Sequence, residues 1–354
     1  MESMKKICID ARMWGIKHTG IGRYVENLVD NLPGEVILIV HPDQKNEPKL
    51  ARFKKYYAKY HPYSVLAQLE MLILLIKIKP DLVHFSHFSV PILWRGKFVV
   101  TIHDLIKHYS ADQSSTTRNP LVYLIKQIGY RISVWNAIKY SQKIIVPANY
   151  WKKEISRKFN INSVKISVTY EGVFLKGSPF KAEGGPLLTP YLMYVGNLYP
   201  HKNIPILIEA VERLKIHLKI ACARNVFENR LPKSEYTQYL GMVSDDELAT
   251  LYKNALCFVF PSKIEGFGLT GLEAMSQCCP VIAANASCLP EIYGDAALYF
   301  DPNNVNDLVS KIQSVLSDKN LMKSLVTKGK LQVKKYSWAT MANQTWEIYQ
   351  NVLR

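Results

Sequence analysis

The sequence predicts an α/β protein made of two doubly wound domains, each a parallel sheet covered by helices on both faces. Short apolar runs alternate with helical patterns in both halves of the chain, an alternation that is typical of parallel sheets. A stretch rich in glycine and proline separates the two series, as a linker does. The length of 354 residues suits two domains, and an apolar content of 48% excludes a disordered chain.

The first half of the chain shows five strand patterns with helix patterns between them. Each strand pattern is a short apolar run, and each helix pattern is a longer stretch that follows a run. The expected strands are Lys6–Asp10, Val36–Val40, Asp81–Phe85, Lys97–Ile102 and Lys143–Pro147, and the expected helices are Arg23–Leu32, Ser64–Ile78 and Leu121–Tyr140.

The second half repeats this alternation. The expected strands are Tyr191–Val195, His217–Cys222, Leu256–Phe260 and Pro280–Ala283, and the expected helices are Ile204–Leu214, Asp245–Lys253, Gly271–Ser276 and Val305–Leu316.

The domain boundary is predicted at 176–190, a segment that holds three glycines and three prolines. We expect a first domain at 1–175, a second at 191–336, and a C-terminal helix at about 337–354 that packs back on the first domain. Ligands of doubly wound domains bind outside the carboxyl ends of the strands. The expected site is therefore the cleft across which the two domains face each other.

The sequence argues against several classes of protein. We expect no secretory signal, because a short polar stretch leads directly into the first expected strand. The run Leu66–Ile78 is shorter than the roughly 20 residues that a membrane-spanning helix needs. The run could insert peripherally into a membrane, but we expect it to be a buried helix between sheet strands. The six cysteines lack zinc-site spacing and are expected to be reduced core residues, as in a cytoplasmic protein.

A glycine-rich loop follows the first expected strand. Gly20 and Gly22 precede a helix expected at Arg23, where backbone N–H groups could approach a phosphate closely. A plain glycine-rich turn fits equally well. The loop is not the dinucleotide-binding fingerprint, because Val25 stands where the third glycine would fall.

A histidine ends the strand Lys97–Ile102, at the edge where ligands are expected. His103 could donate to a sugar hydroxyl or act as a general base. Taken alone, the pattern favours a surface histidine capped by the neighbouring Asp104.

A lysine follows the first strand of the second half. Lys202 stands at the start of a helix, where a cation opposes the helix dipole. This placement suggests a negatively charged ligand, although a lysine at a helix start is also common without one.

Two carboxylates lie in and after the glycine-rich loop that follows Leu256–Phe260. Glu265 is in the loop and Glu273 is eight residues on, so they can contact two separated parts of one elongated ligand. A carboxylate accepts two hydroxyl donors, which suits a ribose diol. Thr270 and Glu273 also have the spacing of a helix capping box, and capping does not exclude ribose binding.

Together these segments resemble the retaining glycosyltransferases of family four (group 1), which have the GT-B fold. The opening segment is most similar to bacterial mannosyl- and rhamnosyltransferases of surface-polysaccharide assembly. The segments that carry the resemblance are Ile9-Asp-Ala-Arg12, Thr19-Gly-Ile-Gly-Arg-Tyr24, Thr101-Ile-His-Asp104, Val195–Asn203, Glu265-x7-Glu273, Pro280-Val-Ile-Ala283, Leu289-Pro-Glu-Ile292, Gly294-Asp-Ala-Ala297 and Phe300-Asp-Pro302.

The resemblance implies a role for each matching position. His103 would contact the transferred sugar, Lys202 would neutralise the donor diphosphate, and Glu265 would contact the sugar; these are the expected catalytic residues. The expected donor-binding residues are Gly20, Gly22, Asn197, Lys202, Gly266, Phe267, Gly268, Leu269 and Glu273. Three positions depart from the family pattern, because Asn197 stands where many members have arginine, Cys278 where glycine is usual and Thr270 where proline is common.

The resemblance also implies the reaction. A sugar, mannose first, would move from a nucleotide-diphosphate donor, GDP-mannose first, to a glycan or lipid-linked acceptor with retention of configuration. The leaving phosphate itself would take the acceptor's proton, so no separate base is required. No Asp-x-Asp motif occurs, and we expect neither a metal nor another cofactor.

The charge of the chain is concentrated in its first half. Residues 1–180 hold 27 Lys and Arg against 13 Asp and Glu, so they contribute +14 of the net +16. Such an excess favours a polyanionic partner. In Arg52–His61, Lys54, Lys55 and Lys59 alternate with aromatic residues, a pattern that suits an anionic membrane, single-stranded nucleic acid or a solvated surface.

The family resemblance favours the membrane over nucleic acid, because acceptors in the family are often lipid-linked. We therefore expect a cytoplasmic protein at the inner face of the membrane, and no nucleic-acid partner. Two other readings stay open: a non-catalytic membrane- or polyanion-binding protein with the same fold, and a nucleotide-sugar epimerase or phosphorylase of the same architecture.

Overall fold

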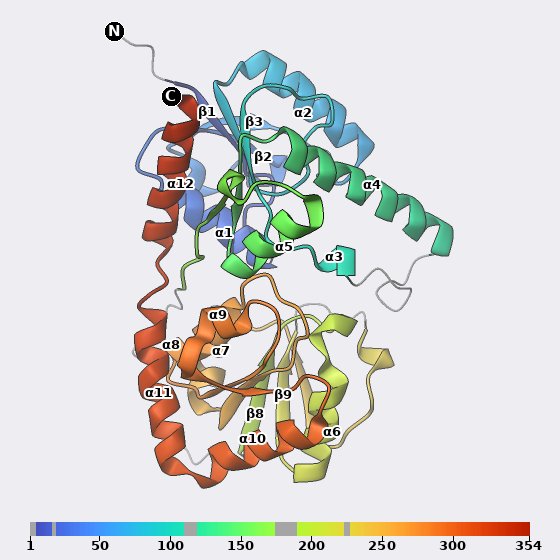
Figure 1. The fold of residues 1–354 in the computed structure, drawn as a ribbon, viewed down its shortest axis with the longest axis vertical. Helices are drawn as coiled ribbons and strands as arrows, with labels where there is room; N and C mark the ends of the chain where they lie inside the picture. The colour runs from blue at the N-terminus through green and yellow to red at the C-terminus, as the bar shows by residue number, and fades with distance from the viewer. Residues whose placement is uncertain (1–4, 16–18, 110–118, 174–189, 223–226) are drawn as a thin grey trace. The chain divides into compact units, whose positions relative to one another are not determined.

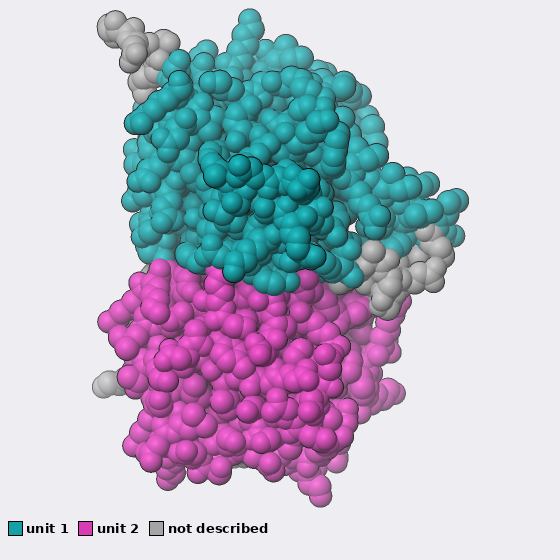
Figure 2. Space-filling view, viewed as in Figure 1, with its two compact units in different colours: residues 1–172, 337–354 teal, residues 173–336 magenta. Residues whose placement is uncertain are grey.

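The computed structural model describes residues 5–15, 19–109, 119–173, 190–222 and 227–354, which form two compact units. Unit 1 comprises residues 1–172 together with 337–354, and unit 2 comprises residues 173–336 (Figure 2). The expected linker at 176–190 lies outside the described residues except for Pro190.

Unit 1 is built on a sheet with seven parallel strands among the described residues (Figure 1). The strand order β3-β2-β1-β4-β5-β6-β7 reverses between β1 and β4, as in a doubly wound sheet. The strands are β1 (Ile7–Asp10), β2 (Ile37–Val40), β3 (Lys54–Tyr57), β4 (Leu82–Phe85), β5 (Phe98–Thr101), β6 (Lys143–Val146) and β7 (Ile166–Val168).

The helices of unit 1 alternate with these strands, and the last helix of the chain joins them. That helix, α12, packs against α1 and contacts β4 and β6. The helices are α1 (Thr19–Asn31), α2 (Val65–Ile78), α3 (Ile106–Tyr109), α4 (Pro120–Tyr140), α5 (Asn149–Phe159) and α12 (Trp338–Leu353).

Unit 2 has a parallel sheet of the same kind, with six strands in its described part. The order β10-β9-β8-β11-β12-β13 reverses between β8 and β11. The strands are β8 (Tyr191–Val195), β9 (His217–Ala221), β10 (Thr237–Gly241), β11 (Cys257–Phe260), β12 (Val281–Ala284) and β13 (Ala297–Phe300). The helices are α6 (Ile204–Leu214), α7 (Asp245–Asn254), α8 (Leu269–Ser276), α9 (Leu289–Tyr293), α10 (Val305–Ser317) and α11 (Lys319–Val333).

The central strands explain why the apolar runs predict the fold. Every residue of β1, β4, β5, β11 and β12 is buried, as parallel strands covered by helices on both faces require. The prediction of two doubly wound α/β domains is confirmed. No helix in the described part of the chain combines the length and the hydropathy needed to cross a bilayer.

The segment Arg52–His61 contains an edge strand that the sequence analysis missed. Residues Lys54–Tyr57 form β3, which pairs with β2 so that Lys54 lies opposite Ile37 and Lys55 opposite Leu38. An edge strand that carries lysines is protected against pairing with other chains. The two lysines therefore have a structural role at the sheet edge, whatever else they contact.

The expectation that Leu66–Ile78 is buried is wrong. The helix α2 buries one side, at Ala67, Met71, Leu75 and Ile78, and exposes apolar residues on the other. The helix has apolar residues on most of its circumference, and its polar residues Gln68, Glu70 and Lys77 do not mark the exposed side, so its sequence gives little sign of which side the sheet covers.

A buried hydrogen-bonded chain anchors α12 to the sheet of unit 1. The hydroxyl of Tyr349 meets Nδ1 of His84, Nε2 of His84 lies 2.8 Å from Oγ1 of Thr101, and that oxygen lies 2.9 Å from the hydroxyl of Tyr24. Burial lowers the pKa of His84 to about 3. The imidazole is therefore neutral near pH 7 and has one donor and one acceptor nitrogen for its two hydroxyl partners.

The substitution Tyr349→Phe is expected to lower the free energy of unfolding by about 1–3 kcal/mol, because it leaves one buried nitrogen of His84 without a partner. Chemical denaturation measures the change. The control is Tyr57→Phe, at a side chain 40% exposed on β3, where the expected change is below about 0.5 kcal/mol. Equal effects of the two substitutions would show that the buried chain does not anchor α12.

Candidate active site

The two best site candidates of unit 2 follow neighbouring strands at the point where the strand order reverses. Lys202 lies in the loop after β8, and Glu265 lies in the loop after β11. Because both strands are parallel, their carboxyl ends meet at one edge of the sheet, and this crevice is where doubly wound sheets bind ligands.

The backbone around Lys202 is held in a defined turn. Residues Pro200–Lys202 form a short 3-10 helix, and Asn203 then takes a left-handed conformation with φ of 57° before α6 begins. The side-chain amide of Asn203 donates to the carbonyl of Pro302 at 2.8 Å. A backbone bond of 2.9 Å from the N–H of Lys263 to the carbonyl of His201 joins this loop to the loop of Glu265.

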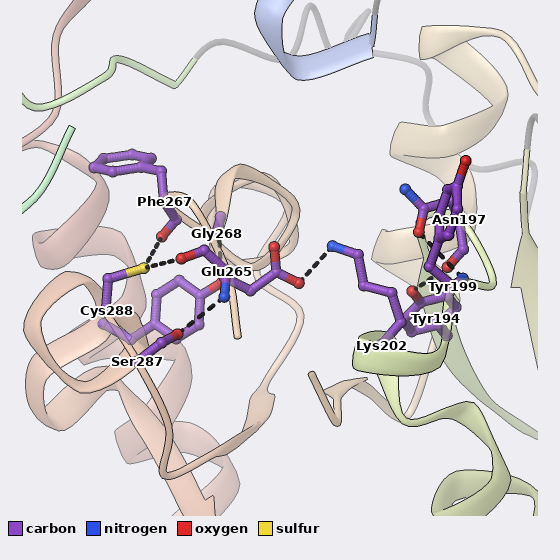
Figure 3. Close-up of polar contacts among 10 residues, drawn as sticks. Tyr194, Asn197, Tyr199, Lys202, Glu265, Phe267, Gly268, Ser287 and Cys288 are labelled. Atoms are coloured by element: carbon purple, nitrogen blue, oxygen red, sulfur yellow. Dashed lines mark hydrogen bonds and ion pairs between the residues drawn. The ribbon is translucent and has the colours of Figure 1, made fainter. Parts of the chain in front are cut away.

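Lys202 and Glu265 form a buried ion pair (Figure 3). Nζ of Lys202 donates to Oε1 of Glu265 at 2.6 Å, and only 12% and 8% of the two side chains are exposed. An ammonium has three donors and a carboxylate has several lone pairs. The pair can therefore hold its own geometry and also offer a donor to an anionic group and an acceptor to a hydroxyl.

The neighbouring histidine adds no charge to this site near neutral pH. The pKa of His201 is lowered to about 4, chiefly by burial and then by the adjacent Lys202 cation. The ammonium of Lys202 also lies 5.6 Å from the ring centre of Phe260, so an aromatic face adjoins the cation.

Residues after β12 hold the loop of Glu265 in place (Figure 3). Oγ of Ser287 accepts from the N–H of Glu265 at 3.0 Å. The thiol of Cys288 donates to the carbonyls of Glu265, at 3.3 Å, and Phe267, at 3.6 Å. The hydroxyl of Tyr293 donates to the carbonyl of Gly268 at 2.6 Å. Four backbone groups of the loop thus have defined partners.

Two glycines allow Tyr293 to approach the loop. Gly268 has φ of +100°, and a Cβ there would lie 2.6 Å from the Tyr293 hydroxyl oxygen. A Cβ on Gly271 would lie 2.3 Å from the same atom. Any side chain larger than that of glycine at position 268 or 271 would therefore displace the loop or Tyr293.

The expected capping box at Thr270 and Glu273 is wrong. The helix α8 begins at Leu269, with Gly268 as its N-cap, so Thr270 is inside the first turn. Its hydroxyl is buried without a hydrogen-bond partner. Glu273 is 4% exposed and also lies within the helix.

The remaining predicted donor-binding residues of unit 2 adjoin this loop or the loop after β8. Gly266 lies between Glu265 and Phe267, whose ring is buried against Tyr336 and points away from the ion pair (Figure 3). The backbone carbonyl of Asn197 accepts from the Tyr194 hydroxyl at 2.8 Å. Cys278 is exposed with φ of 63°, a conformation that explains why glycine would suit this position.

Unit 1 carries the other predicted residues. The helix α1 begins at Thr19, not at Arg23, so Gly20 and Gly22 lie inside its first turn. The N–H groups of a first turn lack intrahelical partners and are suited to an anion. Residues 16–18 of the preceding loop lie outside the described residues.

His103 is not the surface histidine that its pattern alone favoured. It is 9% exposed, with Nδ1 3.3 Å from Oε1 of Glu171 and Nε2 3.1 Å from the carbonyl oxygen of Ser86. Its ring packs edge-on against Tyr24, at 4.7 Å between centres. Asp104 instead caps the next turn, by accepting from the N–H of Ile106 at 2.9 Å.

Several residues of these sites were missed from the sequence. Glu171 is buried beside His103, and Ser287 and Cys288 hold the loop of Glu265. Each lies just after a strand, which was the available signal, but their partners lie more than 20 positions away in the chain. No cluster of His, Cys, Asp and Glu suited to a metal ion occurs in the described ranges.

Comparisons with known proteins agree with this geometry. The sequence profile of the group 1 glycosyl transferases matches residues 180–332, and that of glycosyltransferase family 4 matches residues 18–176. The chain belongs to glycosyltransferase family 4. The two profiles thus match most of unit 1 and most of unit 2. The resemblance of this chain to family 4 is confirmed.

Two relatives of this family 4 chain are mannosyltransferases by name. O-antigen chain mannosyltransferase B of Escherichia coli is 32% identical over 61% of this chain and 62% of its own length. O-antigen chain mannosyltransferase RfbU of Salmonella typhimurium is 28% identical over 66% of this chain and 64% of its own length. The matches therefore span less than two thirds of either relative.

A solved structure has a fold similar to that of this chain. HepE from Anabaena, in complex with UDP and glucose, superposes with a TM-score of 0.76 over 98% of this chain and 100% of that chain, at 16% identity. The GT-B fold expected for this family 4 chain is confirmed by that likeness together with the two doubly wound sheets.

Proposed function

We propose that this family 4 chain is a retaining hexosyltransferase of cell-surface polysaccharide synthesis. It transfers mannose from GDP-mannose to a glycan or lipid-linked acceptor, without a metal ion, at the inner face of the membrane. The observation that carries the proposal is the buried pair of Lys202 and Glu265 at the strand-order reversal of unit 2. The names of the two O-antigen mannosyltransferases support mannose as the sugar.

The pair suits the charges that develop when a sugar leaves a diphosphate. Breaking the bond between the anomeric carbon and the phosphate oxygen makes the sugar cationic and the leaving diphosphate more anionic. The ammonium of Lys202 would stabilise the diphosphate, and the carboxylate of Glu265 would accept from sugar hydroxyls and offset the positive charge. Glu273 would accept from the ribose hydroxyls of the nucleotide.

The acceptor hydroxyl would attack the anomeric carbon on the face that the diphosphate leaves. Its oxygen forms the new bond to the sugar, and its proton passes to the leaving phosphate oxygen, so configuration is retained. His103 would contact the sugar from unit 1, with Glu171 holding its ring. The N–H groups of the first turn of α1, at Gly20 and Gly22, would contact the donor phosphates.

The proposal is tested by incubating the purified chain with GDP-mannose, UDP-glucose and other nucleotide sugars, with a lipid-linked glycan as acceptor. We expect transfer from GDP-mannose, an anomeric configuration in the product that matches the donor, and no loss on addition of a chelator. A chain that binds and turns over no nucleotide sugar would instead be a non-catalytic member of the fold. Isomerised sugar or free sugar phosphate would identify an epimerase or a phosphorylase.

The substitution Gly20→Ala is expected to separate phosphate binding from folding. Among the described residues, a Cβ on Gly20 would meet no atom within 4 Å, so the free energy of unfolding should not fall. If the first turn of α1 contacts the donor, the added methyl occupies the space of a phosphate, and kcat/KM for the donor should fall by roughly tenfold or more. Unchanged kinetics would remove Gly20 from the donor site.

A further inference from the structure

Exposed apolar side chains are concentrated on two helices of unit 1. Of the 20 large apolar side chains that are exposed in the described part of the chain, 12 belong to α2 and α4, whereas unit 2 has only Met242 and Leu331. Both helices lie on the right of unit 1 in Figure 1. A concentration of this kind on one unit marks an interaction surface.

On α4 six of the seven exposed large apolar residues form one stripe. At 3.6 residues per turn they fall within an arc of about 100°. The opposite side of the helix is buried only toward its C-terminal end, at Val134, Ala137 and Ile138. The stripe comprises Leu121, Leu124, Ile125, Ile128, Ile132 and Trp135, which are 48–65% exposed.

On α2 a second stripe has the same form. It comprises Val65, Leu69, Ile73 and Ile76, which are 52–80% exposed. Packed rings link the chain just before α2 to the side of α4 opposite its stripe: Tyr63 lies 5.9 Å from Phe88, and Phe88 lies 5.0 Å from Tyr130. We call these two stripes together the α2–α4 face.

The charges beside the α2–α4 face are almost all positive. The helix α4 has Lys126, Arg131 and Lys139 and no acidic residue. The single acidic residue of α2, Glu70, accepts from the N–H groups of Lys59 and Tyr60 at 3.0 Å each. The two helices therefore offer several cations and one carboxylate, which is engaged by backbone N–H groups, while Asp104 acts on Lys107 beside Tyr63 and Tyr130.

Cations also pair with aromatic rings at the ends of the stripes. Nζ of Lys139 lies 4.4 Å from the ring centre of Trp135, and Nζ of Lys107 lies 5.0 Å from Tyr63 and 5.6 Å from Tyr130. Tryptophan, tyrosine and basic residues at the edge of an apolar surface are typical of the interface between a bilayer and water.

A cavity of about 510 Å³ adjoins the α4 stripe. Its lining combines Arg131 and Lys158 with Ile132 and Trp135 of α4. A phosphate in this cavity would meet the two cations, while acyl chains attached to it would lie along the stripe.

We propose that the α2–α4 face docks unit 1 on an anionic lipid bilayer, with α2 and α4 lying in the headgroup region. The inference rests on the proposed function in that a lipid-linked acceptor requires contact with a membrane. A second copy of the chain is a poorer occupant, since two copies of one face would oppose cations to cations, and lysine is depleted in protein–protein interfaces.

Vesicle co-sedimentation of the full chain tests the proposal, with phosphatidylcholine vesicles that contain or lack phosphatidylglycerol. We expect binding that depends on phosphatidylglycerol. The variant Leu124→Ser/Ile128→Ser should weaken it by about tenfold or more. The matched control Met242→Ser/Leu331→Ser, in unit 2, should bind like the unchanged chain. Neutralising Lys126, Arg131 and Lys139 to Gln should weaken binding by roughly fivefold per cation.

Two further measurements separate the alternatives. Hydrolysis of the nucleotide sugar without vesicles should be unaffected by Leu124→Ser/Ile128→Ser. If the unchanged chain binds vesicles but turns over no donor, the result supports membrane docking by the α2–α4 face and contradicts the proposed function. If the α4 variant and the unit 2 control bound vesicles equally well, the α2–α4 face would not be the membrane-docking surface. The proposal would also be contradicted if the unchanged chain sedimented as a dimer and Leu124→Ser/Ile128→Ser sedimented as a monomer. The α2–α4 face would then join two copies of the chain.

Discussion

Replacing Lys202 by methionine is expected to lower donor turnover by about 10³-fold, because the ammonium that stabilises the leaving diphosphate is lost. The same substitution leaves the carboxylate of Glu265, 8% exposed, without its cation. An uncompensated buried charge costs about 3–5 kcal/mol, so the free energy of unfolding should fall as well. Chemical denaturation and turnover of GDP-mannose measure the two effects.

The double variant Lys202→Met/Glu265→Gln separates catalysis from stability. Both charges are then absent, so most of the lost stability should return. Turnover should stay low, since neither the cation nor the carboxylate is present. If the double variant regained turnover with stability, the ion pair would be a structural feature and the proposed chemistry would be wrong.

Replacing Gly268 by alanine is expected to lower the free energy of unfolding by roughly 2–5 kcal/mol, from backbone strain and overpacking together. The strain comes from a φ of +100°, and the overpacking comes from a Cβ 2.6 Å from the Tyr293 hydroxyl oxygen and 2.9 Å from Cδ2 of Leu289. Because Gly268 is three residues from Glu265 in the same loop, turnover should also fall by at least about tenfold.

Gly241→Ala is the matched control for this substitution. Gly241 also has a positive φ, +71°, but a Cβ there would meet no atom of the described part of the chain within 4 Å. The control therefore measures backbone strain alone, at about 1 kcal/mol, and turnover should be unchanged. Equal losses of stability in the two variants would show that contact with Tyr293 does not hold the loop.

The elements predicted best are the strands buried on both faces. The expected strands at β1, β8 and β11 agree with the structure within one or two residues. A short continuous apolar run between helix patterns is typical of a strand that is buried on both faces. The elements predicted worst lie at the edges of the fold. The strand β3 has the sequence KKYY and is half solvated, so its apolar pattern is weak.

Some features of the candidate site were predicted from the sequence and others were not. Glu265, Lys202 and the glycines were identified because charged and flexible residues are unusual directly after buried strands. Their pairing was not predicted, because Lys202 and Glu265 are 63 positions apart and meet only where β8 and β11 adjoin. The capping prediction at Thr270 failed because Gly268, with its left-handed backbone, starts the helix earlier.

By itself, the sequence determined the two α/β units, the family and the residues that can carry charge chemistry, because these depend on local apolar patterns and on residues beside them. Only the tertiary structure decided which of those residues touch, such as Lys202 with Glu265 and His103 with Glu171. It also decided that one side of the apolar helices α2 and α4 faces solvent. The physical reason is that burial and pairing depend on which elements adjoin in space, and a pattern along one element does not contain that information.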